Sequence, residues 1–153
     1  MADTIQLKQL TSAFYKNHNL IQMMDKNLDK GRGYGVLLAK VKGLQFAIPL
    51  RSKMDINHPF CFDAWGDPEY KSGLDYSKAV VITDSSYISK RPFFTRKKEE
   101  WVTIRRNRRT IVRDFEDFVD QYIEAVSNND QTFLSIKEVK FTTLQNYHNE
   151  LGI

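Results

Sequence analysis

The stretch YGVLLAKVKGLQFAIPL, residues 34–50, decides the fold that we expect for this chain. Two apolar, β-prone runs at 34–41 and 44–49 flank the dipeptide Lys42-Gly43, which favours a tight turn between antiparallel strands. The sequence therefore predicts a β-hairpin. Directly after the hairpin the chain turns polar, and this polar bend is either a solvated turn or a site for an anion.

The segments around the hairpin predict an α+β protein with one domain over residues 1–153. Apolar residues at steps of three and four, apart from one gap, indicate a long amphipathic helix over 97–126. The other expected elements are short: a strand at 3–8, a helix from 11 or 12 to about 20, a strand near 60–65 inside an irregular stretch over 51–76, a strand at 79–83, and a last helix near 142–149.

The composition is that of a folded, modestly basic protein, with 41% hydrophobic residues and a net charge of +4. The single cysteine excludes an internal disulfide and fits a reducing compartment, so we expect a cytoplasmic protein without a membrane span. The charge is uneven. Residues 96–113 carry eight cations and two acids, or +6, whereas residues 114–131 carry six acids and no cation, or −6. Such a basic block favours a polyanionic partner.

The sequence predicts neither a metal site nor a cofactor. The three histidines lie far apart, Cys61 has no ligand-spaced partner, and no glycine-rich phosphate loop is present. Cys61 and His58 make a poor nucleophile and base pair, because their spacing does not bring the side chains together. We therefore expect Cys61 to be structural.

The polar bend contains the strongest local signal, Arg51-Ser52-Lys53. Two cations can neutralise a phosphate, and a serine hydroxyl can donate a hydrogen bond to its oxygens. Elsewhere Arg32 with Tyr34, and Tyr15 with Lys16 and His18, place rings beside cations, a combination that suits unstacked RNA bases.

Two arginines interrupt or flank the apolar stripe of the expected long helix. Arg108 fills its gap, and Arg105 lies four residues after Trp101. Charged groups on a core-facing stripe are costly unless they are paired or open to a polar site. Either the first turns of the helix protrude into solvent, or this end of the helix and the polar bend share one positively charged hollow.

Three runs carry a resemblance to a known family: RGYGVLLAKVKGLQFAIPLRSKM at 32–54, INHPF at 56–60 and SGLDYSKAVVI at 72–82. They resemble the ToxN/AbiQ endoribonuclease toxins of type III toxin–antitoxin systems, closest to the CptN branch, over about residues 5–123. The resemblance implies a compact, strongly twisted antiparallel sheet, nearly a barrel, similar to the Kid/MazF toxins, with peripheral helices. It also implies metal-independent cleavage of cellular or phage RNA in a bacterium, and inhibition by a repeat-derived antitoxin RNA pseudoknot in a closed protein–RNA assembly.

The resemblance also assigns roles by position. The turn serine of the family falls on Ser52, preceded by Arg51, with Lys53 as the nearest cation and Tyr15 as the candidate N-terminal tyrosine. The residues expected to bind RNA are Arg32, Tyr34, Lys78, Arg105, Asn107, Arg108 and Arg109.

Without a metal, the natural nucleophile is the ribose 2′-OH of the substrate, which attacks within the same molecule. The expected products are a 2′,3′-cyclic phosphate and a 5′-hydroxyl. Arg51, Lys53 and Arg105 would stabilise the developing charge, and Ser52 would position a phosphate oxygen. The candidates for the general base that takes the 2′-OH proton are His58, Tyr15 and Lys53. A non-catalytic RNA-binding module and a protein-interaction domain are the alternatives from other classes.

Overall fold

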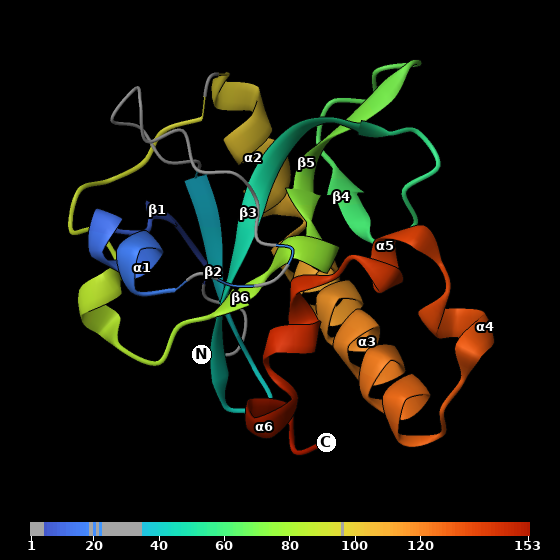
Figure 1. The fold of residues 1–153 in the computed structure, drawn as a ribbon. Coiled ribbons are helices and arrows are strands. Elements are labelled where there is room, and N and C mark those ends of the chain that lie inside the picture. Colours follow the sequence, from blue (N-terminus) through green and yellow to red (C-terminus); the bar gives the residue numbers. More distant parts are fainter. Residues whose placement is uncertain (1–4, 19, 21, 23–34, 96) are drawn as a thin grey trace.

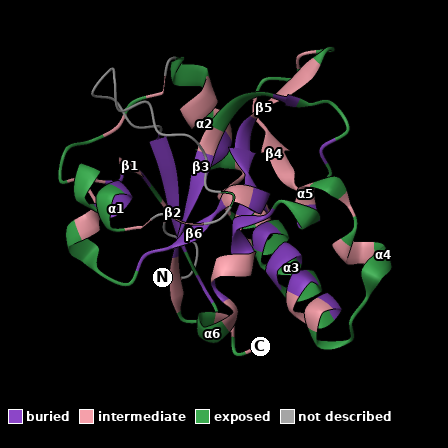
Figure 2. Ribbon diagram, in the orientation of Figure 1, coloured by how far each residue is buried: buried purple, intermediate pink, exposed green. Residues whose placement is uncertain are grey.

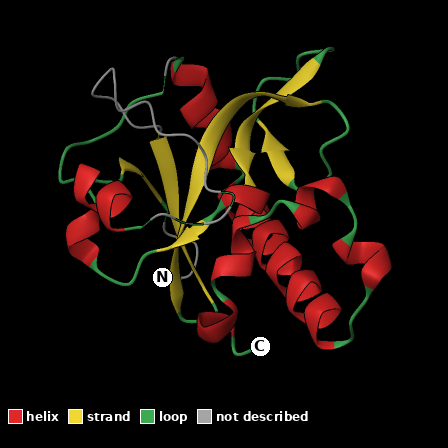
Figure 3. Ribbon diagram, in the orientation of Figure 1, coloured by secondary structure: helices red, strands yellow, loops and turns green. Residues whose placement is uncertain are grey.

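The computed structural model describes residues 5–18, 20, 22, 35–95 and 97–153. Its strands form a six-stranded antiparallel sheet with helices around it (Figures 1 and 3), which confirms the predicted α+β class. The strands are β1 (Gln6–Gln9), β2 (Gly35–Val41), β3 (Leu44–Asp55), β4 (Cys61–Asp63), β5 (Tyr70–Asp75) and β6 (Val80–Val81). The helices are α1 (Ser12–Asn17), α2 (Lys98–Arg106), α3 (Arg108–Ser127), α4 (Gln131–Leu134), α5 (Lys137–Lys140) and α6 (His148–Leu151), with 3₁₀ turns η2 (Tyr76–Lys78), η3 (Ser85–Tyr87) and η4 (Thr143–Asn146).

The predicted hairpin is confirmed as β2 and β3. Val41 pairs with Leu44, which leaves Lys42 and Gly43 as a two-residue turn. Both turn residues have positive φ, 54° and 75°, as the tight turns that match the twist of two strands require. The ammonium group of Lys42 forms an ion pair with Asp120 of α3, so the turn is also tied to the long helix.

Strand β3 is longer than predicted, because it changes partner instead of ending at Pro49. Up to Pro49, which faces Val36, it pairs with β2, and from Leu50 onward it pairs with β5. The strand curves strongly on this path (Figure 1), and it joins the two parts of the sheet in the order β1-β2-β3-β5-β4. The polar bend of the sequence is therefore the second half of a strand.

The prediction of an irregular stretch over 51–76 is wrong at 70–75, where the chain forms β5. Its sequence, YKSGLD, is rich in residues that favour turns, so propensity argued against a strand. Pairing with the neighbouring strands makes this segment a strand despite its propensity. A Cβ on Gly73 would lie 2.0 Å from the carbonyl oxygen of Phe62, so glycine permits the close approach of β4.

The single helix predicted over 97–126 is divided at Asn107. The backbone N–H of Asn107 still reaches the carbonyl oxygens of Thr103 and Ile104, and its side-chain amide donates to Thr103 O at 2.8 Å. Asparagine side chains compete for backbone partners in this way, which favours a helix end over a helix interior. Arg105 is exposed at this junction, not turned into the core, and Arg108 is half-buried.

One hydrophobic cluster extends from Leu7 to Tyr147 and joins the sheet to α1 and α3. Phe115 of α3 lies at its centre, fully buried, with its ring 5.0 Å from that of Phe46 and 5.7 Å from that of Tyr76. Figure 2 shows the buried residues along β2, β3 and one side of α3. Among the helices in the described ranges, none has the length and apolar character needed to cross a membrane.

Candidate functional site

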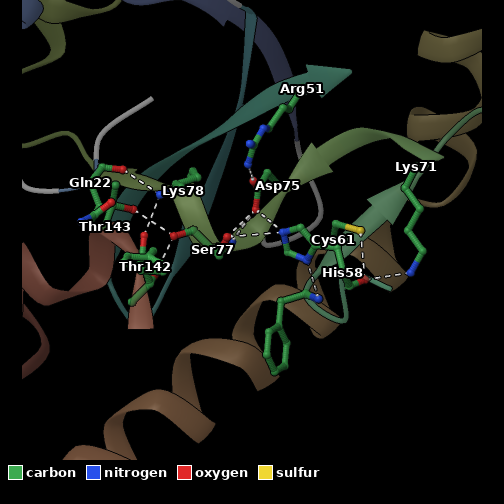
Figure 4. Close-up of polar contacts among 12 residues, drawn as sticks. Gln22, Arg51, His58, Cys61, Lys71, Asp75, Ser77, Lys78, Thr142 and Thr143 are labelled. Atoms are coloured by element: carbon green, nitrogen blue, oxygen red, sulfur yellow. Dashed lines mark hydrogen bonds and ion pairs between the residues drawn. The ribbon is translucent and has the colours of Figure 1, made fainter. Parts of the chain in front are cut away.

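A buried carboxylate organises the region beyond the polar bend. Asp75, at the end of β5, has no solvent exposure and binds three other side chains (Figure 4). Its Oδ2 accepts a hydrogen bond from Nη1 of Arg51 at 2.8 Å, and its Oδ1 lies 2.9 Å from Nε2 of His58 and accepts from Oγ of Ser77 at 2.6 Å. We call these four residues the Asp75 network.

The hydrogen bonds of His58 assign its tautomer. The backbone N–H of Phe60 donates to Nδ1 at 3.0 Å, so Nδ1 is an acceptor and Nε2 carries the proton that points at Asp75. The ring is only 3% exposed. Both nitrogens are therefore engaged, and in this arrangement His58 orients Asp75 but offers no free nitrogen to a substrate.

Ser77 connects the network to the C-terminal part of the chain. Its backbone N–H and its hydroxyl both donate to Oδ1 of Asp75, and Asp75 is thereby the N-cap of η2. Its carbonyl oxygen accepts from the hydroxyls of Thr142 and Thr143 at 2.6 and 3.2 Å. The position of Asp75 is thus fixed by β5, by η2 and, through Ser77, by η4.

The charge of Asp75 is stable in its buried position. Burial disfavours the ionised form, but hydrogen bonds from His58, Ser77 and Arg51 outweigh it and hold the pKa of Asp75 below its usual range. A buried anion in turn fixes the guanidinium that pairs with it. Arg51 is therefore anchored at one end, while 42% of its side chain stays exposed.

Beside the Asp75 network lies a hollow of about 280 Å³, which we call the Arg51–Lys78 hollow. Its volume is near the lower end of the range for small-molecule sites, about 300–1,000 Å³, which suits a group the size of one phosphodiester. Its walls come from β3, η2 and α5 with the residues that follow them, and from Gln22 between α1 and β2. The lining residues are Gln22, Arg51, Asp55, His58, Ser77, Lys78, Lys137, Glu138 and Phe141.

Lys78 faces Arg51 in this hollow. Its ammonium donates to the carbonyl oxygens of Phe141 at 2.6 Å and Gln22 at 3.0 Å (Figure 4), which leaves one N–H for another acceptor. Burial lowers the pKa of Lys78, Asp75 raises it less, and Arg51 lowers it further. Two cations that disfavour one another in this way would both be stabilised by an anion between them.

The structure brings together some of the residues expected at the site. Arg51, His58 and Lys78 meet at the hollow. Ser52 and Lys53 lie next to it, in a bulge where the pairing of β3 with β5 shifts, and neither lines the hollow. Lys53 adopts a positive φ of 56°, its N–H donates to Oγ of Ser72, and its ammonium lies 5.9 Å from the ring centre of Tyr70. A bulge of this kind re-aims side chains at the rim of a site.

Other expected residues lie apart from the hollow. Tyr15 is 3% exposed within the hydrophobic cluster, so its phenol is not presented to a substrate there. Four residues at the α2–α3 junction that were expected to bind RNA, Arg105, Asn107, Arg108 and Arg109, are not among those that line the hollow. The expectation of one hollow shared by the bend and the arginine-rich helix is therefore wrong for this hollow, where Lys78 and Lys137 supply the further cations. Arg32 and Tyr34 lie outside the described residues.

Sequence reasoning missed Asp75, Ser77 and Lys137. Aspartate followed two residues later by serine is a turn signal, because the carboxylate accepts from that backbone N–H. This signal predicts a capped turn and is satisfied by η2. It does not reveal that the same carboxylate is buried and holds an arginine from 24 residues earlier.

Comparison with protein-family models, with curated proteins and with solved structures finds no match to this chain. The likeness to the ToxN/AbiQ toxins and to the Kid/MazF arrangement therefore depends on the three sequence runs alone.

Proposed function

We propose that this protein is a metal-independent endoribonuclease, the toxin of a type III toxin–antitoxin system. The sequence runs that resemble ToxN/AbiQ toxins supply the class. The observation that carries the proposal is the Arg51–Lys78 hollow, in which two cations from different elements face one small space and one of them is fixed by a buried carboxylate.

The chemistry that suits this arrangement is transesterification of RNA. The 2′-OH of the substrate gives its proton to water and its oxygen attacks the adjacent phosphorus. The bond from phosphorus to the 5′-oxygen breaks, the 5′-oxygen takes up a proton, and the products are a 2′,3′-cyclic phosphate and a 5′-hydroxyl. Because the nucleophile belongs to the substrate, the protein contributes mainly position and charge. Arg51 would donate to the non-bridging oxygens, where negative charge develops, and the one free N–H of Lys78 would donate to the 5′-oxygen.

Lys78 also suits the proton transfer to the leaving group. An ammonium whose pKa is lowered by burial gives up its proton more readily than an ordinary lysine, so Lys78 is our candidate for the acid that protonates the 5′-oxygen. His58, with both nitrogens engaged, serves to position Asp75 and Arg51. Ser52 and Lys53, exposed on the bulge, would hold the RNA backbone at the rim of the hollow.

The proposed inhibitor is a repeat-derived antitoxin RNA pseudoknot, bound in a closed assembly in the bacterial cytoplasm. The arginines of the α2–α3 junction, of which Arg105 and Arg109 are exposed, would contact its phosphates. Binding through many phosphate contacts predicts a steep dependence on salt. The targets would be cellular or phage RNA, and the role would be phage defence by abortive infection.

The test is cleavage of RNA by purified protein in EDTA, with the ends of the products identified. We expect a 2′,3′-cyclic phosphate, and no cleavage where a 2′-deoxynucleotide replaces the nucleotide at the cut. Lys78→Met should reduce the rate about 100- to 1,000-fold, the usual loss when one charge-stabilising donor is removed. The control is Lys40→Met, which removes an exposed lysine from β2, outside the hollow.

The same experiment separates the alternatives. A protein that binds RNA but yields no cyclic phosphate is a non-catalytic RNA-binding module. A protein that neither binds nor cleaves RNA is a protein-interaction domain, and both results would overturn the proposal.

A further inference from the structure

The segment that precedes α2 presents an aromatic ring to solvent beside a packed one. Phe94 is 81% exposed, and its neighbour Phe93 packs against the hydrophobic cluster. A Cβ on Gly35 would lie 2.2 Å from Cε1 of Phe93, so the Phe93 ring lies directly on the backbone at the start of β2. Phe93 thus anchors the chain while Phe94 faces outward, and Figure 2 shows the path before α2 as mostly exposed.

Cations flank Phe94 in the sequence. Residues 90–98, KRPFFTRKK, carry five lysines and arginines and no acid. Those that the structure describes are all exposed: Lys90, Arg91, Lys97 and Lys98. We call residues 90–98 the Phe94 segment.

A second ring lies at the far end of the Phe94 segment. Trp65, in the connection from β4 to β5, is 41% exposed, and the ammonium of Lys97 lies 4.1 Å from its ring centre. Its indole N–H donates to Glu100 at 2.7 Å, which fixes the ring at the start of α2. The surface therefore combines the exposed ring of Phe94 and the held ring of Trp65 with exposed cations.

We propose that the Phe94 segment binds single-stranded RNA, with a base stacked on Phe94 and phosphates paired with the flanking cations. Aromatic rings interleaved with cations are the usual means of binding single strands, because every base has a face that can stack. A duplex keeps its bases stacked on one another and offers no free base to Phe94. An anionic membrane would call for a broad apolar face, whereas Phe94 is the one strongly exposed large hydrophobic residue described in this segment.

This inference takes its RNA partner from the proposed function but places contact outside the catalytic hollow. None of the described residues of the Phe94 segment lines the Arg51–Lys78 hollow. The segment would therefore raise affinity for a longer strand without taking part in cleavage. It would act on substrate RNA or on unpaired parts of the antitoxin RNA in the same way.

The test is fluorescence anisotropy with a labelled single-stranded oligonucleotide in which every sugar is 2′-O-methylated, so that it cannot be cut by 2′-OH attack. Phe94→Ala should weaken binding about 5- to 150-fold, the range that corresponds to the loss of one stacked base. Phe94→Trp should keep affinity near that of the wild type. The matched control is Val102→Ala, which removes an exposed apolar side chain from α2.

Two further measurements identify the contacts. An abasic oligonucleotide of the same length should bind the wild type and Phe94→Ala equally. A double variant, Lys90→Ala with Arg91→Ala, should flatten the slope of log affinity against log salt by about 1.4, since each phosphate contact with a single strand contributes about 0.7.

The inference is overturned if Phe94→Ala binds like the wild type, if the abasic strand shows the same loss, or if the wild type prefers vesicles of anionic phospholipid to the oligonucleotide. Its outcome is separate from that of the proposed function. If the wild type does not cleave RNA but Phe94→Ala still loses affinity for the uncleavable strand, the proposed nuclease activity is refuted and RNA binding by the Phe94 segment is supported. If the wild type cleaves RNA but Phe94→Ala changes neither affinity nor specificity for long RNA, the nuclease activity is supported and RNA binding by the Phe94 segment is refuted.

Discussion

Replacing Asp75 by alanine should destabilise the protein far more than replacing its exposed partner Arg51. Asp75→Ala removes the acceptor shared by Arg51, by the ring of His58 and by two groups of Ser77. His58 and Ser77 are 3% and 2% exposed, so water cannot easily replace the carboxylate. Each buried donor left unpaired costs about 1–3 kcal/mol.

Arg51→Met provides the contrast. The side chain of Arg51 is 42% exposed, and Asp75 would keep its bonds from His58 and Ser77. Screening by solvent reduces the contribution of such a half-exposed pair to about 0–1 kcal/mol. The free energies of unfolding of both variants can be measured by urea denaturation, with the slopes compared to the wild type. A loss below about 1 kcal/mol for Asp75→Ala would refute the claim that this carboxylate supports the site.

The pH dependence of stability tests the same carboxylate. Because the pKa of Asp75 is lower in the folded protein than in the unfolded chain, its ionised form contributes stability above the unfolded pKa, about 3.9 for aspartate. This contribution is lost as the pH falls from there through the folded pKa. We expect Asp75→Asn to be less stable than the wild type at neutral pH and to lose less stability on acidification. If the free energy of unfolding falls equally with decreasing pH in the two proteins, the lowered pKa of Asp75 is contradicted.

Three further predictions concern residues around the site. Ser52→Ala or Lys53→Ala should abolish growth arrest in cells while the fold, judged by circular dichroism, is kept. Full toxicity of both variants would show that these two residues do not contribute to the site. Burial raises the pKa of the Cys61 thiol to about 11, so alkylation of the native protein at pH 8 should be slow and should accelerate on unfolding; rapid alkylation of the folded protein would contradict this burial. Gly35→Ala should displace Phe93, lower the stability of the protein and weaken binding of the 2′-O-methyl strand. Unchanged binding would show that the packing of Phe93 does not position Phe94.

The parts of the fold that follow from local sequence could be predicted. Lys42-Gly43 between two apolar runs predicts a hairpin, because glycine readily supplies one of the two positive φ values of the tight turn. The apolar stripe of α3 likewise depends only on its period of three and four residues. The division of the helix at Asn107 could not be read from that period, since the side chain of one residue decides it.

The site was only partly predictable for a physical reason. Arg51, His58 and Lys78 could be selected as residues suited to an anion, each from its own motif. Their arrangement depends on Asp75, which is buried by pairing of β5 with both β3 and β4. The turn-rich sequence of β5 hides that pairing, so the residue that holds the site together is the one that local pattern describes least.

The most direct test of the account is the single-turnover cleavage rate of Arg51→Met, measured in EDTA with RNA bound to saturation. The account predicts cyclic-phosphate product from the wild type and a rate at least about 100-fold lower for the variant, with the fold intact. A variant that cuts RNA as fast as the wild type would show that the Arg51–Lys78 hollow does not hold the scissile phosphate.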